Sequence, residues 1–148
     1  MLGCPEVPVQ TSLAIYTLDL LVKSGAMVTI AGNNAALGLV RTADPARHYI
    51  KETADLDATI GGLAEKKVDA DICYVFIHND TGVSYLATAA ALISGEAVGI
   101  IFGNDAMALA QQCDDASLEN IWAGAVHNPK PIISKVIMEV ERWAASNS

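Results

Sequence analysis

Two histidines and one cysteine stand where polar turns adjoin apolar runs. His78 comes directly after six apolar residues, Ile72–Ile77, and His127 follows a second apolar run. Cys4 lies near the start of the chain, just ahead of a predicted helix. Imidazole exchanges protons near neutral pH, and a thiolate is a nucleophile. These residue types predict acid–base or thiol chemistry wherever the fold brings them together.

A repeated pattern of apolar strand, polar turn and helix predicts the elements that position these residues. We expect strands at residues 26–31, 72–77, 97–102 and 121–126, each followed by a helix. The run Met1–Gly3 has the character of the end of a first strand, and we expect its beginning to lie upstream.

Strands that alternate with helices form a parallel sheet covered on both faces. The sequence therefore predicts a single α/β domain over residues 1–148, with a first strand shortened at the N-terminus. We expect a three-layer α/β/α sandwich with a mainly parallel, roughly five-stranded sheet in flavodoxin-like or Rossmann-like order. The favoured order is 2-1-3-4-5, in which the first strand lies between the second and the third.

The turns that follow the strands are the predicted binding site, because in open parallel sheets they lie along one edge, where ligands bind. We call this the strand-exit edge. Its candidate ligand-binding residues are Asn33, His78, Asn79, Asp80, Asn104, His127 and Asn128. Asparagine and aspartate are also ordinary helix N-caps, worth about 1 kcal/mol each, and Asn33 and Asn104 fit that role. For His78 and His127 the alternative is a structural role in a hydrogen-bonded turn. However, a His-Asn pair occurs after two separate strands, and Asn alone would suffice for capping.

Cys4 is the candidate catalytic residue. It precedes a helix N-terminus, where the helix dipole stabilises a thiolate, although the nearby Glu6 opposes this effect. Cys73 lies in a predicted core strand and Cys113 at a helix C-terminus, so we expect structural roles for both. In an enzyme, Cys4 would supply the thiolate and a histidine its proton partner. A purely structural Cys4 is the alternative.

Metal and phosphate sites are weaker alternatives at the same edge. Cys4, His78, His127 and Asp80 have suitable metal-ligand types, but they come from separate loops without a diagnostic spacing. Helix N-termini after the turns at 32–33 and 103–104 could accept a phosphate. No G-x-G-x-x-G or Walker motif is present, and Lys130 is the only cation near these turns. These features disfavour a polyphosphate, and the sequence assigns no cofactor.

Charge and hydropathy exclude several classes of partner. The net charge is −8, and the nine Lys and Arg residues are scattered along the chain. A chain without a basic stripe is not expected to bind nucleic acid or anionic membrane surfaces. No apolar run reaches the roughly 18–20 residues of a membrane span. Three widely spaced cysteines favour a reducing, cytoplasmic location.

The segment Val83–Ile93 is apolar on nearly every side, although its spacing is helical. A helix without a polar face is usually buried on more than one side. We therefore expect a homo-oligomer, with a dimer favoured and part of this helix in the interface. This feature supports an alternative function, that of a non-catalytic assembly or regulatory subunit.

Seven short motifs, in order and at similar spacing, resemble those of one family. They are residues 2–6 (LGCPE), 8–10 (PVQ), 13–17 (LAIYT), 34–37 (NAAL), 43–45 (ADP), 100–102 (IIF) and 127–129 (HNP). The chain resembles a small family of archaeal, mainly methanogen, proteins of unknown function, and the likeness covers most of its length. The resemblance implies a compact three-layer α/β/α protein with more residues before the first motif, and no catalytic roles. The layout is also similar to DsrE-type sulfur-transfer proteins, whose cysteine context this chain lacks.

The leading hypothesis is a cytoplasmic protein that binds an unidentified small molecule at the strand-exit edge. Thiol chemistry at Cys4 is one form of this hypothesis, and binding without catalysis is the other. The assembly subunit described above is the alternative from a different functional class.

Overall fold

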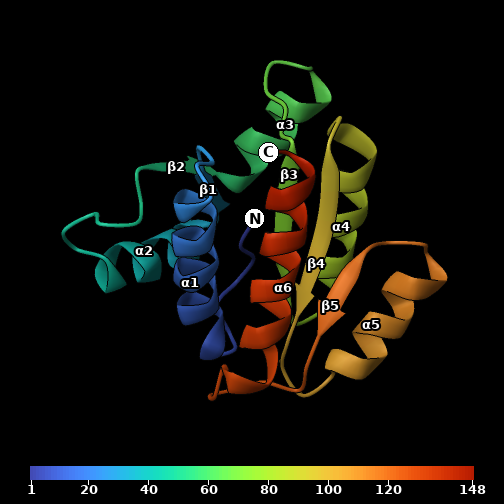
Figure 1. Cartoon of the computed structure of the whole chain (residues 1–148). Coiled ribbons are helices and arrows are strands. Elements are labelled where there is room, and N and C mark those ends of the chain that lie inside the picture. The colour runs from blue at the N-terminus through green and yellow to red at the C-terminus, as the bar shows by residue number, and fades with distance from the viewer.

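A computed structural model describes residues 1–148 as strands and helices in alternation (Figure 1). The elements in chain order are α1 (Val9–Lys23), β1 (Thr29–Gly32), α2 (Asn34–Ala43), β2 (Glu52–Asp55), α3 (Leu56–Ala64), β3 (Ile72–Ile77), α4 (Asp80–Leu92), β4 (Glu96–Ile101), α5 (Ala106–Asp115), β5 (Asn120–Trp122) and α6 (Lys130–Ser146). The predicted α/β class is confirmed. No helix combines the length and the apolar character that a membrane crossing needs.

The sheet is parallel and consists of two parts. One part pairs β1 with β2, and the other has the order β3-β4-β5. Leu2 joins them, because it bridges Gly32 of β1 on one side and Phe76 of β3 on the other. The N-terminal segment therefore lies between the second and third predicted strands, as expected.

The expected sheet of about five strands needs correction, because neither part has more than three. The N-terminal strand is reduced to the bridges of Leu2, whereas β2 is an additional strand at the far edge. Three of the four residues of β2 are polar (Glu52, Thr53 and Asp55), and all but Thr53 lack a strong β preference, so no apolar pattern marks this strand in the sequence.

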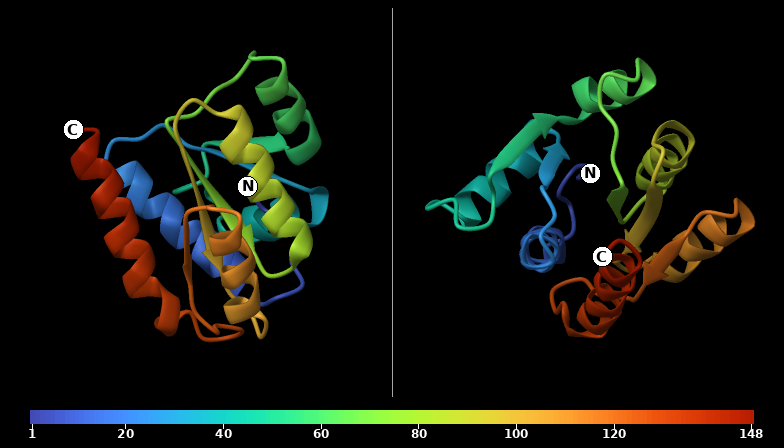
Figure 2. Two further views of the ribbon diagram at one scale, coloured as in Figure 1. Left: turned by 90° about the vertical axis from the view of Figure 1, so that its right-hand side faces the viewer. Right: turned by 45° about the horizontal axis from the view of Figure 1, so that its top comes forward.

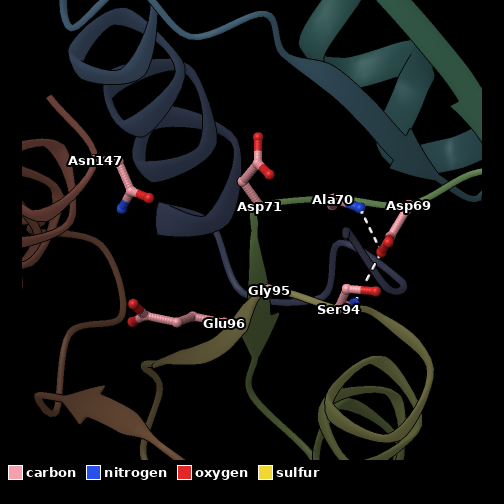
Figure 3. A pocket seen from close by; sticks show the side chains of 7 residues that line it. All are labelled: Asp69, Ala70, Asp71, Ser94, Gly95, Glu96 and Asn147. Carbon is pink, nitrogen blue, oxygen red and sulfur yellow. Dashed lines mark hydrogen bonds between the residues drawn. The ribbon is translucent and has the colours of Figure 1, made fainter.

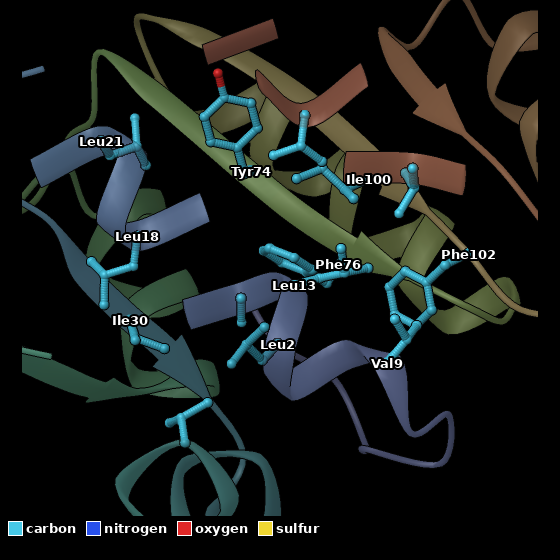
Figure 4. Close-up of a cluster of buried hydrophobic side chains, with 14 of the residues drawn as sticks. Leu2, Val9, Leu13, Leu18, Leu21, Ile30, Tyr74, Phe76, Ile100 and Phe102 are labelled. Carbon is cyan, nitrogen blue, oxygen red and sulfur yellow. The ribbon is translucent and has the colours of Figure 1, made fainter. Parts of the chain in front are cut away.

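Two apolar clusters cover the two faces of the sheet. Helices α1, α2 and α6 pack on one face, and α3, α4 and α5 on the other. Strand β3 contributes to both: Tyr74 and Phe76 point toward α1 and α6 (Figure 4), whereas Val75 and Ile77 belong to the cluster on the opposite face. The apolar run at 72–77 is thus a strand buried on both faces, as predicted. Each such side chain contributes roughly 1.5–3 kcal/mol through burial.

The last strand is shorter than predicted. β5 ends at Trp122, whereas the sequence predicted a strand to residue 126. Beyond Trp122 the backbone continues beside β4 and then turns toward α1, because the carbonyl of Ala125 accepts from Gly103 N–H and that of Val126 accepts from Val9 N–H. These bonds replace a regular ladder and set the position of the segment that carries His127.

Candidate functional site

His78 occupies the turn between β3 and α4, and its side chain is only 5% exposed. The imidazole packs against the Phe102 ring, with the two centroids 5.8 Å apart. Its Nε2 atom lies 3.4 Å from Glu6 Oε2 and 3.4 Å from Asn79 Nδ2. Side chains from the loop before α1, the start of α4 and the end of β4 therefore meet around one histidine.

Asn79 caps α4 and thereby fixes which of its atoms faces the imidazole. Its Oδ1 atom accepts a hydrogen bond from the Gly82 N–H at 3.1 Å. The Nδ2 donor is therefore turned toward His78 Nε2. A neutral His78 then accepts the amide hydrogen at Nε2 and carries its own proton on Nδ1.

Glu6 offers His78 a second partner in the other protonation state. When the imidazole is protonated, both ring nitrogens become donors, so Nε2 donates to the Glu6 carboxylate rather than accepting from Asn79. His78 thus has a polar partner at the same atom whether or not it carries the extra proton. This arrangement suits a group that takes up and releases a proton, the chemistry of a general acid or base.

The backbone around His78 is tied together at the ends of β4 and β5. Gly103 follows β4 with a φ of +95°, a conformation that a residue with a side chain rarely adopts. Its N–H donates to the carbonyl of Ala125 at 2.7 Å, and the Val9 N–H donates to the carbonyl of Val126 at 2.9 Å. The turn after β4, the segment after β5 and the start of α1 therefore form one hydrogen-bonded surface beside His78.

Cys4 is exposed and lies in the same loop as Glu6. The Glu6 N–H donates to the Cys4 carbonyl at 3.0 Å, and the thiol itself makes no hydrogen bond. The strand-exit edge therefore carries a free thiol two residues from the carboxylate that contacts His78, and no hydrogen bond joins the thiol to the imidazole. Cys73 and Cys113 are buried, and burial, aided by Asp114, raises the pKa of the Cys113 thiol.

The remaining predicted residues have structural partners or stand alone. Asn33 caps α2 through the Ala36 N–H at 2.9 Å, Asn128 accepts from the Lys130 N–H at 3.0 Å, and Asp80 accepts from the Gln112 amide at 3.1 Å. His127 is exposed and makes no side-chain hydrogen bond. The structure thus gathers His78 and Asn79 with Glu6, whereas no side-chain hydrogen bond ties the exposed His127 to them.

One further expectation at this edge is wrong. Asn104 does not cap α5: the helix begins at Ala106, so Asp105 holds the N-cap position and makes no side-chain cap bond. No three His, Cys, Asp or Glu side chains come together as a potential metal site. This finding gives no support to the weaker alternative of a metal site formed by Cys4, His78, His127 and Asp80.

Sequence reasoning missed the role of Glu6 and a buried amide beneath the same loop. Gln10 is 1% exposed; its Nε2 donates to the Gly3 carbonyl at 3.2 Å, and its Oε1 is buried without a partner. Helical spacing could have found Gln10, because it lies three and seven residues before the buried Leu13 and Thr17 on one stripe of α1.

Two cavities lie toward the opposite edge of the sheet. A polar cavity of about 460 Å³ is lined by Asp69, Asp71, Glu96 and neighbouring residues (Figure 3). Hydrogen bonds from the Ser94 side chain and N–H, and from the Ala70 N–H, lower the pKa of Asp69 to about 2. The second cavity, an apolar groove of about 1020 Å³, separates β1 from β3. We call it the sheet groove.

The comparisons with known proteins give one family and two similar proteins. Residues 1–139 match the model of a family described as a domain of unknown function, DUF1890. Uncharacterized protein MJ0452 of Methanocaldococcus jannaschii is 32% identical over 137 residues, which span 92% of this chain and 91% of the relative. The solved structure of MT0777 is 39% identical, with a TM-score of 0.85 over 95% of this chain and 93% of that one. The chain therefore belongs to the DUF1890 family of proteins of unknown function.

Proposed function

We propose that this protein binds a small molecule at the strand-exit edge, in a site formed by Glu6, His78, Asn79 and Gly103. The observation that carries this proposal is the contact of the buried His78 with two segments that are distant in sequence, at Glu6 and Phe102, and with the neighbouring Asn79 amide, which gives it a polar partner for each protonation state. Cys4 adds a thiol to the same loop. The three unpaired cysteines support a reducing location such as the cytoplasm.

The charges at the strand-exit edge favour a neutral or cationic molecule. Glu6, Asp80 and Asp105 place carboxylates at the starts of α1, α4 and α5, whereas Lys130 is the nearby cation at the start of α6. A phosphate would meet this net negative field, which opposes the attraction of the helix N-termini. A ligand with hydroxyl, amide or amine groups would complement both Glu6 and His78.

Nuclear magnetic resonance can test the proposal with a defined library of small polar metabolites. We expect at least one compound to shift the amide signals of Glu6, His78 and Gly103 together, because these residues share one surface. A His78→Gln variant has a smaller side chain without the imidazole ring and its ionisable nitrogen. It should therefore bind that compound at least about tenfold more weakly.

The matched control is His48→Gln, which removes an exposed histidine from the turn after α2. This variant should bind the compound as the unaltered chain does. Binding that leaves the Glu6, His78 and Gly103 signals in place, or a library without a single binder, would count against the proposal.

A second candidate function, assembly through α4, rests on the outward face of that helix. The expectation that the helix is buried on more than one side does not hold within one chain, because Gly82, Leu86 and Ala89 are its only fully buried residues. After Asp80, the first residue of α4, the exposed face has small, uncharged side chains. They are Thr81, Ser84, Ala87, Ala90 and Ala91. We propose that this face forms a homodimer interface.

Sedimentation at micromolar concentration tests the dimer. We expect the unaltered chain to sediment as a dimer and an Ala90→Glu variant as a monomer, because a carboxylate would be desolvated in a close helix contact. An Ala108→Glu variant places the same charge on an exposed position of α5 and should stay dimeric. A monomeric unaltered chain would eliminate this candidate.

A further inference from the structure

The outer edge of β2 is an unpaired strand edge. β2 pairs in parallel with β1 alone, and no strand lies on its other side. The right-hand view of Figure 2 shows β2 beside α2, at the end of the sheet opposite β5. All four residues of β2 are exposed or half-buried. An unpaired edge of this kind presents backbone donors and acceptors to another extended segment.

The register of β1 and β2 identifies the backbone groups that face outward. The Ala31 carbonyl accepts from Leu2 N–H, so Ala31 turns its backbone groups away from β2 and Ile30 turns its own toward β2. In a parallel ladder such a residue bonds with the two neighbours of the residue opposite to it, which here is Thr53. The N–H and the carbonyl of Thr53 therefore point away from β1, to the unpaired edge.

Three cations flank this edge, and none of them has a carboxylate partner. Arg41 reaches from α2 to β2, with its Nη2 atom 2.7 Å from Thr53 Oγ1. Lys51 directly precedes β2, and its Nζ donates to the Arg47 carbonyl at 2.8 Å. All three cations are exposed and form no ion pair, although the chain has 17 Asp and Glu residues. We call Arg41, Arg47, Lys51 and the outer edge of β2 the basic edge.

The loop that carries Arg47 is held in place by Asp44. Asp44 is 4% exposed, and its carboxylate accepts from the N–H groups of His48, Tyr49 and Ile50 at 2.8–2.9 Å. The only acidic residue of segment 41–51 is thus turned inward, toward backbone donors. Because the loop is already ordered, a partner that binds the basic edge does not have to order it.

The acidic side chains of β2 have partners of their own. Glu52 Oε2 accepts from Thr29 Oγ1 at 3.0 Å, and it lies on the face of the strand opposite to that of Thr53. The Asp55 side chain caps α3. The face of β2 that Arg41 contacts is therefore positively charged at its amino-terminal end, in a chain whose net charge is −8.

A second copy of this chain fits the basic edge less well than an acidic partner does. Pairing of β2 with itself about a two-fold axis is antiparallel. With Thr53 on the axis, this pairing would bring the two Arg41 side chains together, because each contacts its own Thr53. Like charges that face each other across a strand pair are destabilising.

We propose that the basic edge docks an extended acidic segment of a partner protein, which adds to β2 as a further strand of the sheet. The backbone of the segment exchanges hydrogen bonds with Thr53, and its carboxylates lie on the face of α2, next to Arg41 and Lys51. β2 has four residues, so few backbone bonds form. Charge therefore selects the partner, as pockets for side chains do at longer strand edges.

Fluorescence anisotropy of a labelled six-residue peptide tests the proposal. We expect a peptide of alternating glutamate and valine to bind at least about tenfold more tightly than one of alternating lysine and valine. A double variant, Arg47→Glu with Lys51→Glu, should lose at least about tenfold in affinity for the acidic peptide. The matched control, Lys67→Glu with Lys130→Glu, makes the same change in net charge at exposed positions elsewhere and should bind as the unaltered chain does.

N-methylation of the peptide separates strand addition from attraction between charges alone. In a strand, alternate residues turn their N–H groups to the same side. Methyl groups on the glutamate nitrogens and methyl groups on the valine nitrogens therefore block opposite edges of the peptide. One of these two peptides should bind at least about tenfold more weakly than the other, since only one of them loses the N–H groups that face β2.

Four results would overturn the proposal. They are the absence of binding by the acidic peptide, equal binding by the two double variants, equal binding of the two methylated peptides, and an oligonucleotide that binds the basic edge as tightly as the acidic peptide. Sedimentation adds a check on a second copy as the occupant. We expect the peptide to leave the oligomeric state unchanged, and dissociation of a dimer by the peptide would also contradict the proposal.

Discussion

Replacing Gly95 with alanine is expected to lower the free energy of unfolding by about 3 kcal/mol or more, because the added carbon has no room. A Cβ at Gly95 would overlap the carbonyl of Asp71 and come within 2.5 Å of the Ala70 carbonyl oxygen. Both obstacles are backbone atoms, which cannot rotate away as a side chain can. The same backbone accepts hydrogen bonds from the Gly95 and Glu96 N–H groups, so any shift would loosen the start of the β3–β4 pair.

Urea denaturation of Gly95→Ala and Gly61→Ala measures this effect against a matched control. Gly61 is exposed in α3, and nothing lies within 4 Å of the place where its Cβ would be. Alanine favours the helix over glycine, so Gly61→Ala should gain about 0.5–1 kcal/mol. A Gly95→Ala protein as stable as the unaltered chain would contradict the close approach of the two strands at this point.

The strands and helices were predictable from the sequence where burial alone determines the local structure. The run at 72–77 has six apolar residues, and only a strand covered on both faces accommodates them all. Asn33 follows an apolar strand and caps the next helix, as its position indicated. By contrast, residues 123–126 lie beyond β5, because the carbonyls of Ala125 and Val126 accept hydrogen bonds from the Gly103 and Val9 N–H groups instead of continuing a regular ladder.

The site was predictable only in part, for a different reason. The position of His78 at a strand exit follows from the parallel sheet, which places all such turns on one edge. Its contact with Glu6 joins segments 72 residues apart and depends on the path of the loop between Gly3 and Pro8. No periodicity encodes that path. His127 satisfied the same sequence argument as His78, yet it lies on an exposed segment after the shortened β5.

Thiol labelling is expected to distinguish Cys4 from the other two cysteines by a rate factor of about a thousand or more. Cys4 is exposed, whereas Cys73 and Cys113 are 9% and 0% exposed and react only after local or global unfolding. Iodoacetamide at neutral pH should therefore add one group to the folded chain and three in denaturant, as counted by mass spectrometry. A Cys4→Ser variant should take up none while folded.

Labelling of the folded Cys4→Ser variant would mean that Cys73 or Cys113 is open to solvent, contrary to their burial.

The same assay shows whether the Cys4 thiol and the His78 imidazole act together. No hydrogen bond joins Cys4 to His78, so a His78→Gln variant should label at the rate of the unaltered chain. A Glu6→Gln variant should label only slightly faster, because one nearby negative charge is lost. A labelling rate that follows His78 protonation would instead require the loop to close, bringing thiol and base within reach of one substrate. Equal rates would favour binding by His78 and Glu6 over thiol catalysis.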